Sequence, residues 1–211
     1  MTLYSLTDEL IQIRPNWFVG DNKDDANRWS RVHPRFQMHD GCIVDLGCLG
    51  WNRPFEEIDS DNWAGYFFDK KRVIGVDPQE AMNSKAELFK GFVANFSGKG
   101  SLVSNGLGAT LLKSSEGNFE VLNWNDFKQK FNIKSISILK INIEGSEWDL
   151  IDSFNSEDFL GVDQICISFH DWLTEFSECA SRTDACVKKI MSNGYSMVDL
   201  DIYGWKLFLR T

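Results

Sequence analysis

A carboxylate followed by a glycine-rich turn is a feature of this chain that could hold a cofactor. Residues 44–50 have the sequence VDLGCLG, in which Asp45 ends an apolar run and Gly47 and Gly50 follow it. Glycines in such a turn let the backbone approach a ligand where a side chain would collide with it. The alternative is a plain tight turn between a strand and a helix. We predict that Asp45, Gly47, Cys48 and Gly50 line a cofactor loop.

The spacing of this loop separates two classes of cofactor. A dinucleotide-binding enzyme would carry G-x-G-x-x-G, whose helix start holds a pyrophosphate, whereas this chain has D-x-G-x-x-G. The anionic Asp45 would repel a pyrophosphate but would suit the positive amino group of S-adenosylmethionine. The loop therefore favours S-adenosylmethionine, and a nicotinamide-dependent oxidoreductase stays as an alternative.

A second acidic residue, Asp77, follows the apolar run 73–76 and precedes Pro78. In doubly wound sheets an acid at the end of the second strand accepts hydrogen bonds from ribose hydroxyls. The alternative is an aspartate that only caps the following helix. Together with Asp45, this spacing predicts that Asp77 and the adjacent Pro78 form the ribose side of the cofactor site.

Polar side chains interrupt another apolar run, residues 139–147, with the sequence LKINIEGSE. In an extended segment Lys140, Asn142 and Glu144 would share one face, at the sheet edge where open α/β folds bind ligands. The alternative is a strand end with solvated charges. We expect Asn142 to orient an acceptor and Glu144 to be a candidate base.

His170 is one of three histidines and follows the apolar run 164–169. Its ordinary pKa of about 6.5 suits proton transfer near neutral pH. The alternative is a structural histidine packed under a helix. We predict that His170 or Glu144 is the general base of a transfer reaction.

The elements that must position these residues follow from the apolar pattern. Short apolar runs predict buried strands at 42–46, 72–76, 89–96, 135–143 and 164–169. Helices are expected from 78 to 88, 125 to 131 and 171 to 193, and a last strand pair at 197–200 and 205–209. The alternation predicts a doubly wound, mainly parallel α/β sheet with a C-terminal antiparallel hairpin.

Two segments lie outside this alternation. Residues 1–40 are expected to form an N-terminal cap, with a short helix at 6–13 stopped by Pro15, over a main domain of residues 41–211. Residues 97–118, rich in Gly, Ser and Asn, predict loops with one β excursion. Both segments are expected to shape the acceptor pocket, because specificity usually resides in loops on a fixed scaffold.

Composition restricts the partners. The formal net charge of −9, without a long basic tract, disfavours a nucleic acid. The five cysteines form no C-x-x-C pair, so no metal site is predicted. No apolar stretch approaches the roughly 20 residues of a membrane helix. We therefore expect a cytoplasmic protein with reduced cysteines and no membrane partner; the sequence carries no signal for an oligomeric state.

From residue 41 to residue 172 the chain resembles the FkbM family of S-adenosylmethionine-dependent methyltransferases. The resemblance rests on residues 44–47, 76–78, 139–147 and 168–171. It implies a Rossmann-like class I methyltransferase fold and O-methylation of a hydroxyl on a sugar, another small molecule or a glycan. It also implies that Ala94 and Asn95 line the adenine pocket.

The chain departs from the family pattern in two places. Asn142 stands where the family usually has Asp, and the glycine loop is one residue shorter than the common D-x-G-x-x-x-G form. The first departure removes an acid from the strand end. A non-catalytic module that keeps the cofactor fold is therefore a further alternative.

Overall fold

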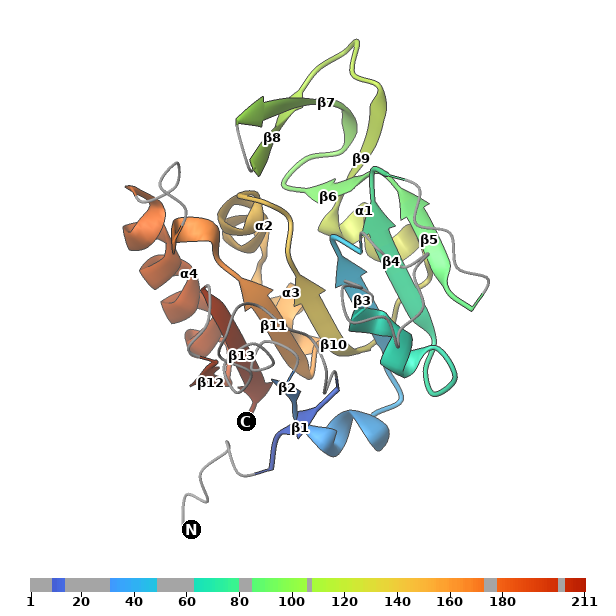
Figure 1. Ribbon diagram of the computed structural model, residues 1–211, viewed down its shortest axis with the longest axis vertical. Helices are drawn as coiled ribbons and strands as arrows, with labels where there is room; N and C mark the ends of the chain where they lie inside the picture. The colour runs from blue at the N-terminus through green and yellow to red at the C-terminus, as the bar shows by residue number, and fades with distance from the viewer. Residues whose placement is uncertain are drawn as a thin grey trace, which may run out of the picture.

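The computed structural model describes residues 9–13, 31–48, 63–79, 85–105, 108–172, 178–200 and 204–211. Its central layer is a seven-stranded sheet with the order β12-β13-β11-β10-β3-β4-β5 (Figure 1). The parallel strands are β3 (Cys42–Leu46), β4 (Val73–Asp77), β5 (Glu87–Lys90), β10 (Ile136–Ile141) and β11 (Gln164–Ser168). Strand β13 (Trp205–Arg210) runs antiparallel between β11 and β12 (Tyr195–Asp199). The predicted doubly wound α/β sheet with a C-terminal hairpin is confirmed.

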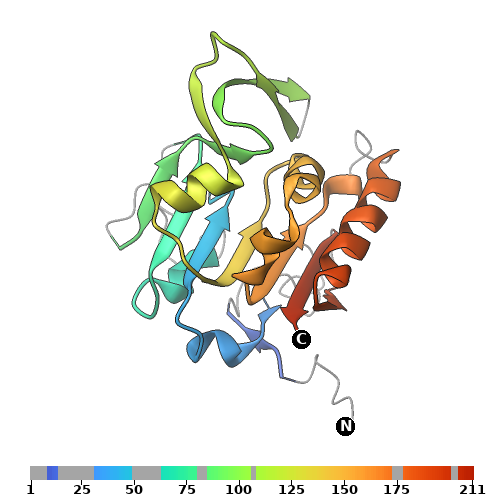
Figure 2. The same ribbon diagram turned by 180° about the vertical axis from the view of Figure 1, so that it is seen from behind.

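Both faces of this sheet are covered. Every residue of β3, β4, β10 and β11 is buried, which explains their continuous apolar runs. Figure 2 shows α1 (Trp124–Lys130), α2 (Glu147–Ser153), α3 (Ser156–Leu160) and α4 (Ala180–Ser192) over one face. The other face packs on η2 (Pro34–Gln37) and η3 (Trp63–Phe67). Each face has its own apolar core.

A second sheet lies beyond the carboxyl ends of the parallel strands (Figure 1). It has the order β6-β9-β7-β8, with β6 (Phe92–Ala94), β7 (Gly98–Asn105), β8 (Gly108–Lys113) and β9 (Phe119–Asn123). The expectation of loops with one β excursion at 97–118 was wrong. The pairing of β7 with both β8 and β9 stabilises strands that their glycine and serine content does not favour.

The N-terminal segment contacts the main sheet. Strands β1 (Ile11–Gln12) and β2 (Arg31–Val32) pair antiparallel, so the helix predicted at 6–13 is wrong at residues 11–12; residues 6–8 lie outside the described part. Arg35 donates hydrogen bonds to the Asp163 carboxylate and the Arg210 carbonyl. These contacts join the N-terminal segment to the main sheet, while the division into a cap of residues 1–40 and a domain of residues 41–211 stays a prediction.

Two other element predictions need correction. The helix expected at 78–88 is wrong at 87–88, which begin β5, and residues 80–84 lie outside the described part. The strand expected at 89–96 divides at Gly91 between β5 and β6, which belong to different sheets. Of the long helix expected from 171 to 193, the structure describes η4 (His170–Trp172) and α4.

No described helix has the length and apolarity required to span a bilayer.

Candidate functional site

Most of the predicted site residues that the structure describes lie near the carboxyl ends of the central strands. The chain passes from β3 to β4 and β5 on one side, then returns to place β10 on the other side of β3. Open α/β sheets bind ligands at such a reversal, outside the carboxyl ends of the strands. Strands β3, β4, β10 and β11 end here, as the sequence predicted.

The Gly47 turn is held tightly between two neighbouring strands. Gly47 has a φ of +81°, and a Cβ added to it would lie 1.8 Å from the Asn142 carbonyl oxygen. The amides of Gly47 and Cys48 both donate to the Val76 carbonyl, at 2.9 and 3.2 Å. Glycine is therefore required by the protein's own packing. Burial raises the pKa of the Cys48 thiol, which keeps it neutral. The predicted Gly50 lies outside the described residues.

Asp45 makes an ion pair that sequence reasoning missed. Lys140 Nζ lies 2.7 Å from Asp45 Oδ1, with exposed side-chain fractions of 5% and 0%. Nζ also donates to the Gly47 carbonyl at 2.6 Å. Lys140 therefore compensates the buried Asp45 charge and ties it to the glycine turn. The ion pair follows from the parallel pairing of β3 and β10, which places Lys140 opposite Asp45. Neither segment alone reveals the register of that pairing, so the sequence could not predict it.

Asp77 ends β4 and is 6% exposed. Its Oδ1 accepts a hydrogen bond from the Gln79 amide at 2.8 Å, a local turn contact. This contact fixes the carboxylate at the strand tip, one strand away from Gly47. Asp77 therefore has a structural role in this turn, and its ribose role, with the half-buried Pro78 beside it, stays a prediction.

Ala94 and Asn95 lie at the end of β6, in the second sheet. Ala94 is buried and Asn95 is exposed. The Gly91 amide, just before β6, donates to the Asp77 carbonyl at 3.2 Å and so joins this segment to the tip of β4. Their assignment to the adenine pocket stays a prediction.

His170 lies in a cluster of carboxylates. Its Nδ1 is 2.9 Å from Glu147 Oε1, and its Nε2 is 3.4 Å from Glu144 Oε2. Glu147 is fully buried, while the Glu144 side chain is 48% exposed. The two residues predicted as alternative bases thus face each other, and Glu147, which sequence reasoning did not single out, lies behind them.

The charges around His170 change its pKa. Burial alone would lower the pKa, but the hydrogen bond that His170 donates to Glu147 and the charges of Glu147, Glu144 and Asp171 outweigh it. The net result is a pKa above the ordinary value. His170 therefore keeps its proton to a higher pH than a solvated histidine.

The expectation that Lys140, Asn142 and Glu144 share one extended face is wrong. Strand β10 ends at Ile141, and Glu144 has a φ of +52° in the turn before α2. Lys140 instead points to Asp45, within the sheet edge. Only the half-buried Asn142 and the exposed Glu144 remain near the surface, where an acceptor could reach them.

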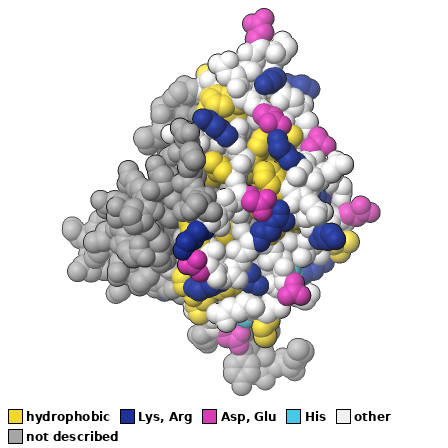
Figure 3. Space-filling view, turned by 90° about the vertical axis from the view of Figure 1, so that its right-hand side faces the viewer, with side chains coloured by type: hydrophobic (Ala, Val, Ile, Leu, Met, Phe, Trp, Pro, Cys, Tyr) yellow, Lys and Arg dark blue, Asp and Glu magenta, His cyan; other side chains and the backbone are white. Residues whose placement is uncertain are grey.

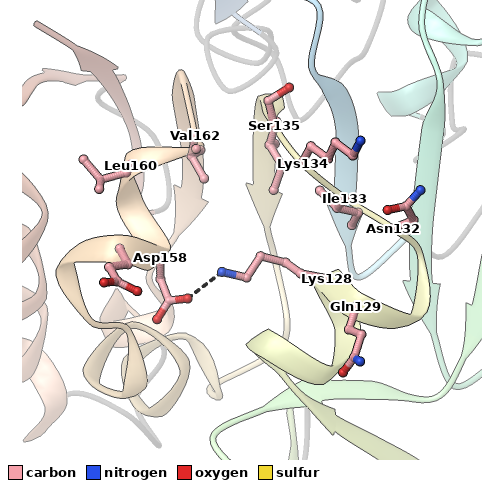
Figure 4. A pocket seen from close by; sticks show the side chains of 12 residues that line it. Lys128, Gln129, Asn132, Ile133, Lys134, Ser135, Asp158, Leu160 and Val162 are labelled. Carbon is pink, nitrogen blue, oxygen red and sulfur yellow. Dashed lines mark hydrogen bonds and ion pairs between the residues drawn. The ribbon is translucent and has the colours of Figure 1, made fainter.

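A pocket of about 540 Å³ lies at the opposite edge of the main sheet, between α1 and α3 (Figure 4). It opens beside residues 134–136, where β10 begins. The Lys128 ammonium and the Asp158 carboxylate, 2.7 Å apart, cross it. Because parallel α/β sheets bind ligands at their carboxyl ends, this pocket is not the candidate active site.

The strand order decides the fold. The antiparallel β13 lies between β11 and β12, at the end of a parallel sheet whose order reverses at β3. The fold is that of the class I methyltransferases.

No protein-family model and no curated protein matches the chain. Among solved structures, it is similar to the methyltransferase FkbM from Methylobacillus flagellatus KT (13% identity, TM-score 0.46, 81% of this chain and 43% of that one). It is also similar to the MycE methyltransferase from the mycinamycin biosynthetic pathway, solved with Mg and SAH (10% identity, TM-score 0.48, 82% of this chain and 46% of that one). A third similar structure is the Methanococcus jannaschii fibrillarin pre-rRNA processing protein (11% identity, TM-score 0.45, 99% of this chain and 84% of that one).

The chain thus spans less than half the length of the first two proteins. At these identities and TM-scores the similarities carry no argument about activity. A function for this chain therefore has to be inferred from the strand order and from the geometry of the site.

Proposed function

We propose that this chain is an S-adenosylmethionine-dependent methyltransferase that methylates a hydroxyl on a sugar, another small molecule or a glycan, with His170 as the general base. The observation that supports it best is the position of His170. Its ring is buried at the carboxyl edge of a class I methyltransferase sheet, and its Nε2 faces the exposed Glu144.

The residues at this edge fit the cofactor. The Asp77 carboxylate, held at the tip of β4 beside the Gly47 turn, is the acceptor that ribose hydroxyls require. When bound, S-adenosylmethionine supplies an electrophilic methyl group whose transfer forms a C–O bond and leaves a neutral thioether. Asp45 supports the Gly47 turn through Lys140, so its predicted contact with the cofactor's amino group is not needed for this fit.

The chain's own residues align and deprotonate the acceptor. Asn142 orients the hydroxyl, and His170 Nε2 takes its proton as the oxygen gains the methyl group. Orientation of reactants supplies about 7–11 kcal/mol in favourable cases, and a base contributes typically about 10²–10⁴-fold in rate. The site therefore depends more on alignment than on the base.

The surroundings of His170 favour a neutral acceptor with a ring. Glu144 and Asp171 make the surface beside His170 negative, which disfavours an anionic compound. Trp172 is 48% exposed, and its ring centroid lies 6.0 Å from that of His170. An exposed indole gives a ring-shaped acceptor an apolar surface.

We further propose membership of the FkbM family, a cytoplasmic location, and the absence of nucleic-acid and membrane partners. The net charge of −9 supports the exclusion of nucleic acid. On the face shown in Figure 3, the basic side chains of the described residues are mixed with acidic ones. Ion pairs such as Arg72–Glu87 and Lys130–Glu120 place a carboxylate beside a basic group, which weakens any positive patch there.

Calorimetry with S-adenosylhomocysteine and with NAD separates the leading alternatives. We expect binding of S-adenosylhomocysteine alone, and binding of NAD alone would favour an oxidoreductase. Transfer of a labelled methyl group to a panel of neutral hydroxyl compounds then tests catalysis. Cofactor binding without transfer to any of them would favour a non-catalytic module, the alternative that Asn142 supports.

A further inference from the structure

Glu147 is a buried carboxylate with three hydrogen-bonding partners among the described residues and no contact with solvent. Its Oε1 accepts from the Ile143 amide at 2.9 Å, and its Oε2 accepts from the Gly145 amide at 3.0 Å. The same Oε1 lies 2.9 Å from His170 Nδ1. An unpaired buried carboxylate is strongly unfavourable, and these three partners compensate its burial.

We propose that Glu147 is the positioning residue of the site, fixing both the tautomer of His170 and the turn that carries Glu144. This proposal rests on the proposed function, because it gives Glu147 a role in the proton transfer assigned to His170. Glu147 itself is too deeply buried to touch the acceptor. It acts through the two residues that it holds.

The tautomer follows from the direction of the hydrogen bonds. An ionised carboxylate only accepts hydrogen bonds, so the hydrogen between Glu147 and His170 belongs to Nδ1. In the neutral imidazole the other nitrogen, Nε2, then carries the lone pair. Nε2 is the nitrogen on the side of the exposed Glu144. Glu147 therefore makes Nε2 the basic atom and turns it toward the place where an acceptor would arrive.

The same carboxylate stabilises an unusual backbone. Glu144 has a φ of +52°, a left-handed conformation that residues other than glycine adopt only with support from the surroundings. The amides on either side of it, those of Ile143 and Gly145, are the two that Glu147 binds. One side chain thus fixes Glu144 and His170 relative to each other.

The charged groups that face His170 come from three elements of the described part of the chain. They are Glu147 from α2, Glu144 from the preceding turn and Asp171 from η4. The neutral Trp172 ring also lies beside it. Glu147 makes the shorter printed contact with the imidazole, 2.9 Å at Nδ1 against 3.4 Å from Glu144 at Nε2, and it is the more buried carboxylate. Loss of its charge is therefore expected to affect His170 more than loss of either neighbour.

The test is nuclear magnetic resonance of the histidine side chains in the free protein. The chain has three histidines, and His170→Asn assigns the His170 signals. Long-range proton–nitrogen spectra report the tautomer, and a pH titration reports the pKa. In the wild type we expect hydrogen on Nδ1 in the neutral form and a pKa above 6.5. Hydrogen on Nε2 would overturn the proposal without the need for any variant.

Glu147→Gln keeps the size of the side chain and removes its charge. We expect the pKa of His170 to fall and the neutral ring to become a mixture of tautomers. Asp149→Asn is the matched control, since Asp149 is an exposed carboxylate on the same helix that pairs with Arg182. It should leave both properties unchanged. An unaltered tautomer and pKa in Glu147→Gln would contradict the proposal; if that variant does not fold, the wild-type tautomer decides.

Kinetics separate this proposal from the proposed function. If methyl transfer is found, Glu147→Gln should lower kcat about 10- to 100-fold with an unchanged KM for the cofactor. In Glu147→Gln the pH at which kcat rises should be lower than in the wild type, because the pKa of His170 is lower. If the tautomer is as expected but no transfer occurs, only the proposed function fails. If transfer occurs and Glu147→Gln has normal kinetics, only the role of Glu147 fails.

Discussion

Two clusters of buried charge lie at the same sheet edge, and they differ in their access to solvent. The Asp45–Lys140 pair is closed, because both side chains are at most 5% exposed and Lys140 also binds the Gly47 carbonyl. The His170 cluster is buried at Glu147 but open at Glu144, which is 48% exposed. The difference indicates that the first cluster builds the turn, whereas the second can exchange a proton with a bound molecule.

His170→Gln tests the open cluster and should have the largest effect. Without the imidazole, the rate of methyl transfer should fall about 10²–10⁴-fold, the usual contribution of a general base. His33→Gln is the control, because the His33 ring pairs with the exposed Glu9, away from the sheet edge. Transfer of a labelled methyl group measures both variants. Full turnover in His170→Gln would mean that the His170 cluster, like the Asp45–Lys140 pair, takes no part in proton transfer.

Lys140→Met tests the closed cluster. It removes the cation that lies 2.7 Å from the buried Asp45 carboxylate, and breaking a buried ion pair costs about 3–5 kcal/mol of unfolding free energy. Lys85→Met, which breaks the exposed pair with Asp69, should cost at most about 1 kcal/mol. Denaturant unfolding measures both. The double variant Asp45→Asn, Lys140→Met should recover part of the lost unfolding free energy. Equal losses in Lys140→Met and Lys85→Met would show that the buried pair stabilises the fold no more than an exposed one.

Asp77→Asn should have a smaller effect, on binding. Asparagine can still accept from the Gln79 amide, so the turn is kept while the charge is lost. A hydrogen bond to a charged group is worth about 1.5–3 kcal/mol, so the Kd for S-adenosylhomocysteine should rise about 10- to 100-fold. Calorimetry measures the change, with the exposed Asp69→Asn as control. An unchanged Kd would leave Asp77 with a turn role only.

The smallest effect concerns the dependence of stability on pH. The pKa of His170 is raised in the folded protein, so its protonation stabilises the fold fully below about pH 6.5, the ordinary value. This contribution is lost as pH rises through the folded pKa. Unfolding free energies measured from pH 5.5 to 8.5 should therefore fall more steeply for the wild type than for His170→Gln. Parallel curves would mean that the carboxylates do not act on His170.

The sequence predicted the strands that carry the site because each is buried on both faces and therefore apolar throughout. Strands β3, β4, β10 and β11 are of this kind, and their ends placed Asp77 and His170 at the carboxyl edge of the sheet. The first half of strand β5 escaped prediction because β5 lies at the edge of the sheet and is exposed at Glu87 and Lys90. Its pattern could equally continue a helix.

The contacts within the site could not be predicted, because they join segments far apart in the chain. Glu147 and His170 are 23 residues apart, and Lys140 and Gly47 are 93 apart. Such pairs depend on strand register and on the turn before α2, which no local pattern fixes. A glutamate in the first turn of a helix is ordinary in any sequence, so Glu147 carried no distinctive signal.

A map of backbone amide signals, recorded while S-adenosylhomocysteine is added to the isotope-labelled protein, tests the central claim most directly. We predict changes at Gly47, Asp77 and Asn142, at the carboxyl edge of the sheet, and none at Lys128 and the other residues of the pocket at the opposite edge. No change at any amide, or changes confined to that pocket, would contradict the account.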